Sequence, residues 1–233
     1  MRTAAVEDYV KTIYKLQNQP ETVSTSALAE RIGTSAAAVT KMLKHLAEAN
    51  LVTYTPYHGA RLTSMGEKVA LEVIRHHRLL ELYLSQAMGY SWDQVDAEAE
   101  KLEHYISEDF EDSIERLLGF PTFDIHGDPI PTRDGQMPEA AYEALAVQPD
   151  GAALTVRRVS DTDAALLRYL DECGLRPGAE VYVLAREPFG GSLSLQVAGR
   201  EVRVSPAAAR SVFVEQSVVR EEGVTATQQK IQL

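Results

Sequence analysis

The chain has 233 residues, of which 45% are hydrophobic and 24% charged, with a single cysteine, Cys173. These proportions are typical of an ordinary globular protein, and no apolar run approaches the ~20 residues that a membrane-spanning helix needs. The N-terminal segment lacks the apolar core of a signal peptide, so we expect a cytoplasmic protein. A lone cysteine excludes an intrachain disulfide and a thiolate metal cage, which leaves oxygen and imidazole ligands for any metal ion.

Charge is distributed unevenly along the chain. The net charge of −11 argues, taken alone, against a nucleic-acid partner, because Lys and Arg supply phosphate affinity. Residues 1–64, however, carry seven Lys and Arg against five acids, whereas residues 93–116 carry ten acids against two basic residues. The sequence therefore combines a mildly basic head, suited to DNA, with an acidic middle, suited to cations.

Three helical patterns and a hairpin fill the first 65 residues. Apolar residues recur at helical spacing over 1–18, 24–31 and 36–49. A tight turn separates the last two patterns, and Thr34 or Ser35 can cap the third helix. The runs LVTYT and ARLTS then alternate like strands on either side of the turn PYHG. This order of elements is typical of a winged helix-turn-helix.

The middle of the chain is helical. A long helix is predicted over 64–88, followed by helices over 92–107 and 108–118. Residues 119–151 are rich in Pro and Gly, which predicts a linker with one short helical piece near 139–146.

The last third changes to a period of two. ALTVRRV, EVYVLAREP, SLSLQVAG and EVRVSP are typical of strands, with one helix at 162–173, and the polar tail from Glu221 onward is expected to fray. Short strands, glycine turns and a single helix indicate a small β-barrel of the SH3-like kind. The fold class is therefore mainly α with a small β-barrel.

The third helical pattern presents small and basic side chains at its start. Alanines let a backbone approach the major groove closely, while hydroxyls and Lys contact bases or phosphates. The recognition face offers no Arg, Asn or Gln for a bidentate base contact, so readout would rest on methyl contacts and DNA shape. The candidate DNA-contacting residues are Thr34, Ser35, Ala36, Ala37, Thr40, Lys41 and Lys44, joined by His58 and Arg61 on the wing. They predict double-stranded DNA as a partner; the alternative is a helix-turn-helix that serves only packing.

Carboxylates and histidines recur at metal-ligand spacing on the middle helices. Glu100, Glu103 and His104 stand at i, i+3 and i+4, so they project from one helical face. The further candidates are Asp96 on the same face, His77 and Glu81 at i, i+4 on the preceding helix, and Asp8 on the first helix. Such groups would repel one another at neutral pH unless a cation held them. The set predicts a site for one or two divalent ions.

A catalytic role for this metal site is disfavoured. The string Glu100-Lys-Leu-Glu103-His104 differs from the inverted zinc-protease motif H-x-x-E-H in its first ligand. The paired Glu-x-x-His helices of di-iron bundles are also absent from the sequence. We therefore expect no enzyme, and neither a membrane nor a small organic substrate as a partner. A metal-buffering protein with a vestigial helix-turn-helix remains the alternative to a regulator.

Several segments, in order, carry a family resemblance: VEDYVKTIYKL, LTSMGE, RHHRLLE, DAEAEKLEHYISE and HGDPIP. Together with the element order, they resemble the diphtheria-toxin-repressor family of metal-dependent transcriptional regulators. The resemblance implies a homodimer, paired through the middle helices, that binds palindromic operator DNA and represses metal-uptake genes. The expected domains are a winged helix-turn-helix at 1–65, a helical dimerisation and metal-binding domain at 66–140, a linker at 141–151, an SH3-like (FeoA-like) domain at 152–222 and a flexible tail at 223–233.

The resemblance also assigns the candidate ligands. Asp8, Glu100, Glu103 and His104 match the family's primary metal site, and His77, Glu81 and Asp96 match its ancillary or second-ion site. Positions 8 and 100 are usually Met and Cys in the iron-responsive branch, whereas Asp and Glu are typical of the manganese branch. Hard carboxylates suit Mn²⁺ for the same reason, although Fe²⁺ stays open as the alternative cofactor.

Two further positions bear on the number of ions. Lys11 stands where manganese-branch members carry a Glu ligand, which argues against a closely spaced dinuclear centre of that type. Asp161 falls nearest the place from which the C-terminal domain of iron-branch relatives lends a ligand to the ancillary ion. The resemblance therefore predicts a metal site but leaves one ion or two open.

Overall fold

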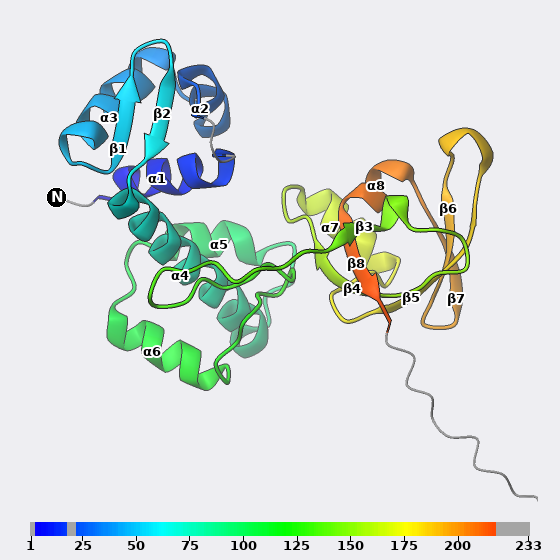
Figure 1. Cartoon of the computed structure of the whole chain (residues 1–233). Coiled ribbons are helices and arrows are strands. Elements are labelled where there is room, and N and C mark those ends of the chain that lie inside the picture. The colour runs from blue at the N-terminus through cyan, green and yellow to red at the C-terminus, as the bar shows by residue number, and fades with distance from the viewer. Residues whose placement is uncertain (1–2, 18–21, 218–233) are drawn as a thin grey trace, which may run out of the picture.

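The computed structural model describes residues 3–17 and 22–217. Within these ranges three helices and a hairpin come first, three more helices follow, and a β-rich region ends the described chain (Figure 1). Each region has its own cluster of buried apolar side chains. No helix of the described ranges has the length and apolar character that a membrane crossing requires.

The first region contains every element of the predicted winged helix-turn-helix. Ile13, Leu28 and Leu43, one from each helix, are completely buried in its core. Gly33 adopts a left-handed φ of 73°, which ends the second helix, and the Ser35 Oγ accepts from an amide of the third at 3.2 Å. The elements are α1 (Ala4–Leu16), α2 (Thr25–Ile32), α3 (Ala36–Glu48), β1 (Val52–Thr55) and β2 (Gly59–Leu62).

One long helix, α4 (Ser64–Met88), joins two cores. Its bounds are those that the sequence predicts, because the Thr63 side chain caps its start and a left-handed glycine ends it. Val69, near its start, is buried in the winged-helix core, whereas Leu80 is buried in the next core with the following helices. The helix therefore connects the winged-helix region rigidly to the helical region.

Two shorter helices, α5 (Val95–Leu102) and α6 (Glu108–Leu117), contact α4. The predicted helix over 92–107 is wrong at both ends, since α5 begins later and ends earlier. A serine caps α6 with extended backbone, so the chain must leave α5 before that point. Glu103 and His104 consequently lie at the turn after α5 and not on a continuous helical face.

The short helix predicted near 139–146 is also wrong. This segment contains β3 (Glu143–Ala144) and a 3₁₀ turn over Leu145–Val147. The two residues of β3 pair with a strand much later in the chain. Local propensity could not reveal that pairing, because the partner is distant in sequence.

The last region is a six-stranded antiparallel sheet in the order β3-β8-β4-β5-β6-β7. β3 and β7 are its edges, so the closed barrel that the sequence predicts is not formed by the described strands. The predicted strands and the helix at 162–173 are present, whereas α8 and β8 were not predicted. The tail from Glu221 and the end of the 152–222 domain lie outside the described residues. The elements are β4 (Ala153–Val159), α7 (Ala164–Glu172), β5 (Glu180–Arg186), β6 (Leu193–Val197), β7 (Arg200–Val204), α8 (Pro206–Arg210) and β8 (Val212–Gln216).

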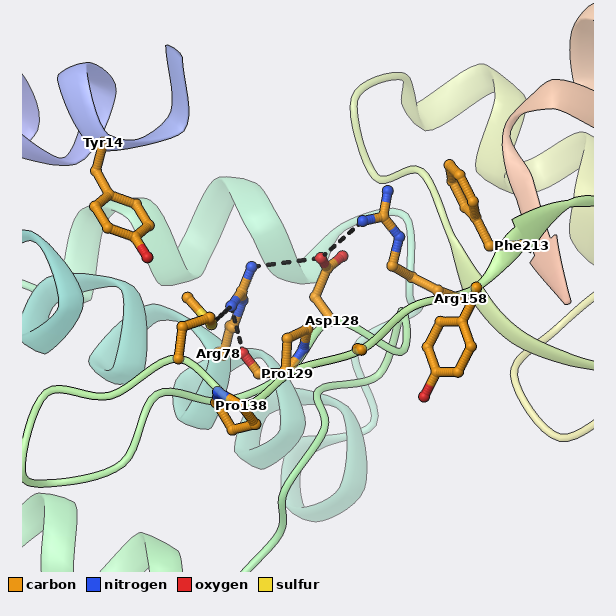
Figure 2. Close-up of a pocket in the computed structure, with 10 residues that line it drawn as sticks. Tyr14, Arg78, Asp128, Pro129, Pro138, Arg158 and Phe213 are labelled. Carbon is orange, nitrogen blue, oxygen red and sulfur yellow. Dashed lines mark hydrogen bonds and ion pairs between the residues drawn. The ribbon is translucent and has the colours of Figure 1, made fainter. Parts of the chain in front are cut away.

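Asp128 fastens the helical region to the sheet. Its Oδ1 lies 3.4 Å from nitrogens of both Arg78 on α4 and Arg158 on β4 (Figure 2). The Arg158 guanidinium also lies 4.2 Å from the centre of the Phe213 ring. These contacts border a cavity of about 350 Å³ that extends to Tyr14 on α1. The loop that carries Asp128 is thereby held between α4 and β4.

A buried ion network between α4 and α6 yields a stability prediction. Arg75 donates to Glu111 at 2.5 Å, and His76 lies 3.3 Å from the same carboxylate. Burial by itself raises the pKa of Glu111, but the hydrogen bonds from His76 and Arg75 outweigh it and lower this pKa to about 2. We expect Glu111→Gln to lower the free energy of unfolding by about 2 kcal/mol at neutral pH, because Arg75 loses a charged partner.

The same pKa fixes the pH dependence of this loss. A carboxyl with a depressed folded-state pKa contributes stability above its unfolded pKa of about 4.5, and this contribution is lost as the pH falls toward 2. The difference between wild type and Glu111→Gln, measured by urea unfolding, should therefore shrink between pH 5 and pH 2. Asp109→Asn, an exposed change on the same helix, is the matched control. Equal unfolding midpoints for wild type and Glu111→Gln at pH 7 would contradict the prediction.

Candidate metal centre and DNA-binding surface

Buried carboxylates and imidazoles line α4 where it faces α1, α5 and the loop at 124–128. Glu81, Glu103 and His77 are at most 4% exposed, and His126 is completely buried. Removing so many ionisable groups from water costs free energy unless cations or hydrogen bonds compensate. The donors fall into two neighbouring groups. We call them the α1–α5 cluster (Asp8, Lys11, His77, Glu100, Glu103 and His104) and the Glu81 cluster (Glu81, Asp124 and His126).

In the α1–α5 cluster, Asp8, Glu103 and His104 place one donor atom each within 4.8 Å of one another. The His104 Nε2 lies 2.9 Å from Asp8 and 3.6 Å from Glu103. The other ring nitrogen, Nδ1, lies 2.7 Å from a Glu7 carboxylate oxygen, to which it can donate. This orientation leaves the Nε2 lone pair facing the two carboxylates, as in histidines that bind metal.

The electrostatics of Asp8 favour a cation at this point. Burial raises the pKa of Asp8; His104 opposes the rise, and the charges of Glu100 and Glu103 add to it. A divalent ion among these three donors would remove the repulsion between the carboxylates. Asp8 comes from α1 and the other two donors follow α5, so one ion would join the two regions.

A second part of the same cluster already contains a cation, the ammonium of Lys11. Its Nζ lies 2.7 Å from Glu100, 2.7 and 2.8 Å from the two Glu103 oxygens, and 3.3 Å from His77. Burial lowers the pKa of Lys11, but Glu103 and Glu100 outweigh burial and raise it. Glu100 is therefore paired with Lys11, and its side chain is half exposed.

The Glu81 cluster contains imidazole and carboxylate atoms that lack partners. His126 Nε2 donates to the Trp92 carbonyl at 2.9 Å, which leaves Nδ1 as the nitrogen with a free lone pair. Among the described residues neither this Nδ1 nor the Glu81 Oε1, 3.6 Å away, has a hydrogen-bond partner. Unpaired buried polar atoms cost free energy, so their convergence fits a bound ion.

Asp124 completes this cluster. Its Oδ1 accepts from the amides of His126 and Asp128, both at 2.9 Å. Burial raises the pKa of Asp124 to about 7, and the charges of Glu81 and Asp128 contribute to the rise. Gly127 lets the loop approach β4, since a Cβ there would lie 1.9 Å from a backbone oxygen of that strand. Three donors on a fixed loop and a rigid helix are suited to a divalent ion.

His77, a member of the α1–α5 cluster, also reaches toward the Glu81 cluster. Its Nδ1 lies 2.6 Å from Glu103, and its Nε2 lies 3.3 Å from Asp96 and 3.5 Å from Glu81. Burial lowers the pKa of His77, but the neighbouring carboxylates of Asp96, Glu103 and Glu81 together raise it well above the usual range. The grouping of His77, Glu81 and Asp96 is thus present, although the Asp96 side chain is half exposed.

Sequence reasoning missed three of these residues. Asp124 and His126 lie in the segment FDIHGDPIP, where an acid and an imidazole two residues apart were the available signal. Glu7 orients His104, whereas the sequence prediction named only the adjacent Asp8. Asp161 lies just after β4. Its charge raises the pKa of Asp128, so the two residues are near one another. Asp161 belongs to none of the donor groups found among the described residues.

The start of α3 is an exposed surface of small and hydroxyl side chains. Val39 and Leu43 face the core, so the opposite face is free for contact. The Thr40 hydroxyl donates to a carbonyl of its own helix at 2.8 Å, and its oxygen lone pairs remain available. The exposed members of the predicted set are Thr34, Ser35, Ala36, Ala37, Lys41, Lys44 and His58, with Thr40 and Arg61 half-buried.

Known proteins match the chain along nearly all of this architecture. Residues 1–60 match the N-terminal DNA-binding domain of iron-dependent repressors, residues 63–132 match their metal-binding and dimerisation domain, and residues 145–216 match the FeoA domain. The iron-dependent repressor IdeR of Mycobacterium tuberculosis is 31% identical over 207 residues, which cover 84% of this chain and 89% of that protein. The chain belongs to the iron-dependent repressor family. The predicted resemblance to diphtheria-toxin-repressor proteins is thereby confirmed.

Further proteins are similar to this chain over comparable lengths. The diphtheria toxin repressor of Corynebacterium diphtheriae is 25% identical, covering 90% of this chain and 96% of that protein. A solved structure of a manganese-dependent transcriptional repressor in complex with manganese is 40% identical, with a TM-score of 0.82 over 91% of this chain and all of that one. The manganese regulator SloR is 32% identical, with a TM-score of 0.70 over 91% of this chain and 98% of that one.

The Glu81 cluster gives a prediction about metal-dependent stability. An ion that binds only the folded protein stabilises it by about 2.7 kcal/mol at a hundredfold excess over Kd. We expect Glu81→Gln to reduce the rise in melting temperature that Mn²⁺ gives the wild type, because the Glu81 cluster loses one of its three candidate donors. Glu98→Gln, a change of the same kind on α5, should keep the full rise. An unchanged rise in Glu81→Gln, measured by calorimetry, would remove Glu81 from the metal centre.

Proposed function

We propose that the protein is a metal-responsive repressor whose DNA-binding form is stabilised by Mn²⁺ bound among Asp8, Glu103 and His104. This proposal rests on the fact that the three donors come from two different regions of the fold. Asp8 lies on α1 in the winged-helix region, whereas the other two follow α5 in the helical region. Family membership supports metal-dependent, DNA-binding transcriptional regulation as the function of the chain.

The donor chemistry favours manganese. An ion bound here supplies positive charge that carboxylate oxygens and one imidazole can share, a donor set that suits Mn²⁺. The similar manganese-dependent repressor structures support the same ion. Fe²⁺ is the second candidate, because the relatives from Mycobacterium and Corynebacterium are named as iron-dependent repressors and diphtheria toxin repressors. Binding titrations with both ions under anaerobic conditions would decide between them.

The Glu81 cluster is proposed to hold a second ion. Its donors join α4 to the loop at 124–128, and that loop is fastened to β4 through Asp128. The amide of Val159, at the end of β4, also donates to the His126 carbonyl at 2.9 Å. Asp161, two residues further on, is therefore the candidate through which the C-terminal domain contributes to this ion. An ion here would fix the position of the C-terminal domain, for which we propose an SH3-like fold.

The exposed N-terminal end of α3 is proposed to enter the major groove. In a homodimer, two such helices must stand about 34 Å apart to reach successive major grooves of a palindromic operator. The helical region offers the dimer interface, because large apolar side chains are exposed on and near α5 and α6. They are Leu102, Tyr105, Phe110, Leu117 and Phe120. With this assignment we propose a winged helix-turn-helix at 1–65, a dimerisation and metal-binding domain at 66–140, a linker at 141–151, an SH3-like domain at 152–222 and a tail at 223–233.

The regulatory step is a shift of population between two arrangements. When α1 and α5 lie as in Figure 1, all three donors converge, and an ion stabilises that arrangement over others. A ligand shifts an equilibrium only through its different affinity for the two states, and the contribution of Asp8 from α1 provides that difference. The residues of this chain therefore convert ion binding into a fixed position of α3.

Asp8→Asn is the matched test of this linkage. The exchange preserves the size of the side chain but removes its charge. Asp8 contacts His104, whereas Lys11 contacts Glu100 and Glu103, so the exchange leaves the Lys11 contacts intact. We expect Mn²⁺-stimulated affinity for the operator to fall at least tenfold, while the metal-free affinity is unchanged. Gel shifts with DNA upstream of metal-transport genes would measure both, with Glu98→Gln as control. Equal wild-type affinity with Mn²⁺ and with chelator would refute the proposal and favour a metal-buffering protein.

Lys41 provides a test of the DNA-binding surface. Its exposed side chain on α3 is suited to contact a phosphate, so Lys41→Ala should weaken binding to operator and random DNA alike. Because a homodimer presents Lys41 twice, the magnitude of the slope of log K against log salt should fall by about 2. Lys68→Ala, at an exposed position on α4, should leave the slope unchanged. An unaltered slope in Lys41→Ala would exclude this lysine from the interface.

A further inference from the structure

The position of Lys11 in the α1–α5 cluster calls for a separate explanation. A lysine that is 3% exposed is unusual, because an ammonium loses its hydration when buried. Here Glu100 and Glu103 surround the ammonium at 2.7–2.8 Å. His77 Nδ1 is 3.3 Å from it but 2.6 Å from Glu103, so its stronger contact is with the carboxylate.

The atoms around this ammonium are themselves a potential metal site. One donor atom each from His77, Glu100 and Glu103 lies within 4.8 Å of the others, as ligands of a single divalent ion do. The Lys11 Nζ lies among these atoms. Because Glu103 also belongs to the donor group with Asp8 and His104, two ions bound to both groups would share one carboxylate.

We propose that Lys11 is a tethered cation that takes the place of a second divalent ion, so that the α1–α5 cluster binds one ion. This inference rests on the proposed function and specifies the metal count of the same site. An ammonium at the end of a side chain cannot diffuse away or be chelated, and it satisfies the carboxylates at all metal concentrations. Its positive charge also repels a second ion from the space that it fills.

Exchange of Lys11 for an acid should open the second position. In Lys11→Glu the ammonium is removed and a carboxylate is added beside His77, Glu100 and Glu103. We expect equilibrium dialysis of metal-free, full-length protein against Mn²⁺ to give one bound ion more per subunit than in the wild type. Electron paramagnetic resonance should show a spin-coupled Mn²⁺ pair in Lys11→Glu only. Lys68→Glu, which changes the net charge equally at an exposed position on α4, should match the wild type in both measurements.

The outcomes separate this inference from the proposed function. If wild-type protein binds no Mn²⁺, the proposed function fails. If the wild type binds Mn²⁺ but a folded Lys11→Glu gains no ion, only the role of Lys11 fails. The wild type supplies an independent test should the variant not fold, since a spin-coupled pair at saturating Mn²⁺ would overturn the inference. Lys11→Met, which removes the charge without adding a ligand, should bind an additional ion more weakly than Lys11→Glu.

Discussion

The arrangement depends on one constraint: carboxylates buried between α1, α4 and α5 need positive charge close by. Glu103 is 1% exposed and lies within reach of Lys11, His77 and His104 at once. Its charge could not be buried without those neighbours, because an unpaired carboxylate in the interior costs several kcal/mol. Lys11 meets part of this need, and beside Asp8 we propose that a divalent ion supplies the rest.

The α1–α5 cluster is connected to the winged helix because α4 belongs to two cores. Its first turns are packed in the winged-helix core, and its later turns carry His77 and Glu81. Because α1 and α3 share the winged-helix core, a change in how α1 lies against α5 would also change the position of α3. The loop at 124–128 adds a second connection, since Asp124 and His126 face Glu81 while Asp128 pairs with Arg78 and Arg158 (Figure 2). The α1–α5 cluster and the Glu81 cluster thus both lie where regions of the fold meet.

Local signals in the sequence were sufficient for most helices. Caps at Ser35 and Thr63 and the left-handed Gly33 fix where helices begin and end, and these depend only on neighbouring residues. The helix predicted near 139–146 failed because β3 is held by pairing with β8, a contact between distant segments. The predicted helix over 92–107 was too long at both ends, although the serine that caps α6 is a local signal.

The sequence by itself determined the family, the helix-turn-helix and the kinds of ligand, because these follow from residue types at fixed local spacing. Through the resemblance it assigned Asp8, Glu100, Glu103 and His104 to a primary metal site and His77, Glu81 and Asp96 to an ancillary one. It also singled out Lys11 as a departure. Only the tertiary structure decided how the donors divide. It paired Glu100 with the Lys11 ammonium, turned Glu7 toward His104, and brought Asp124 and His126 to Glu81. Such choices depend on distances between segments remote in sequence, which burial and charge compensation select when the chain folds.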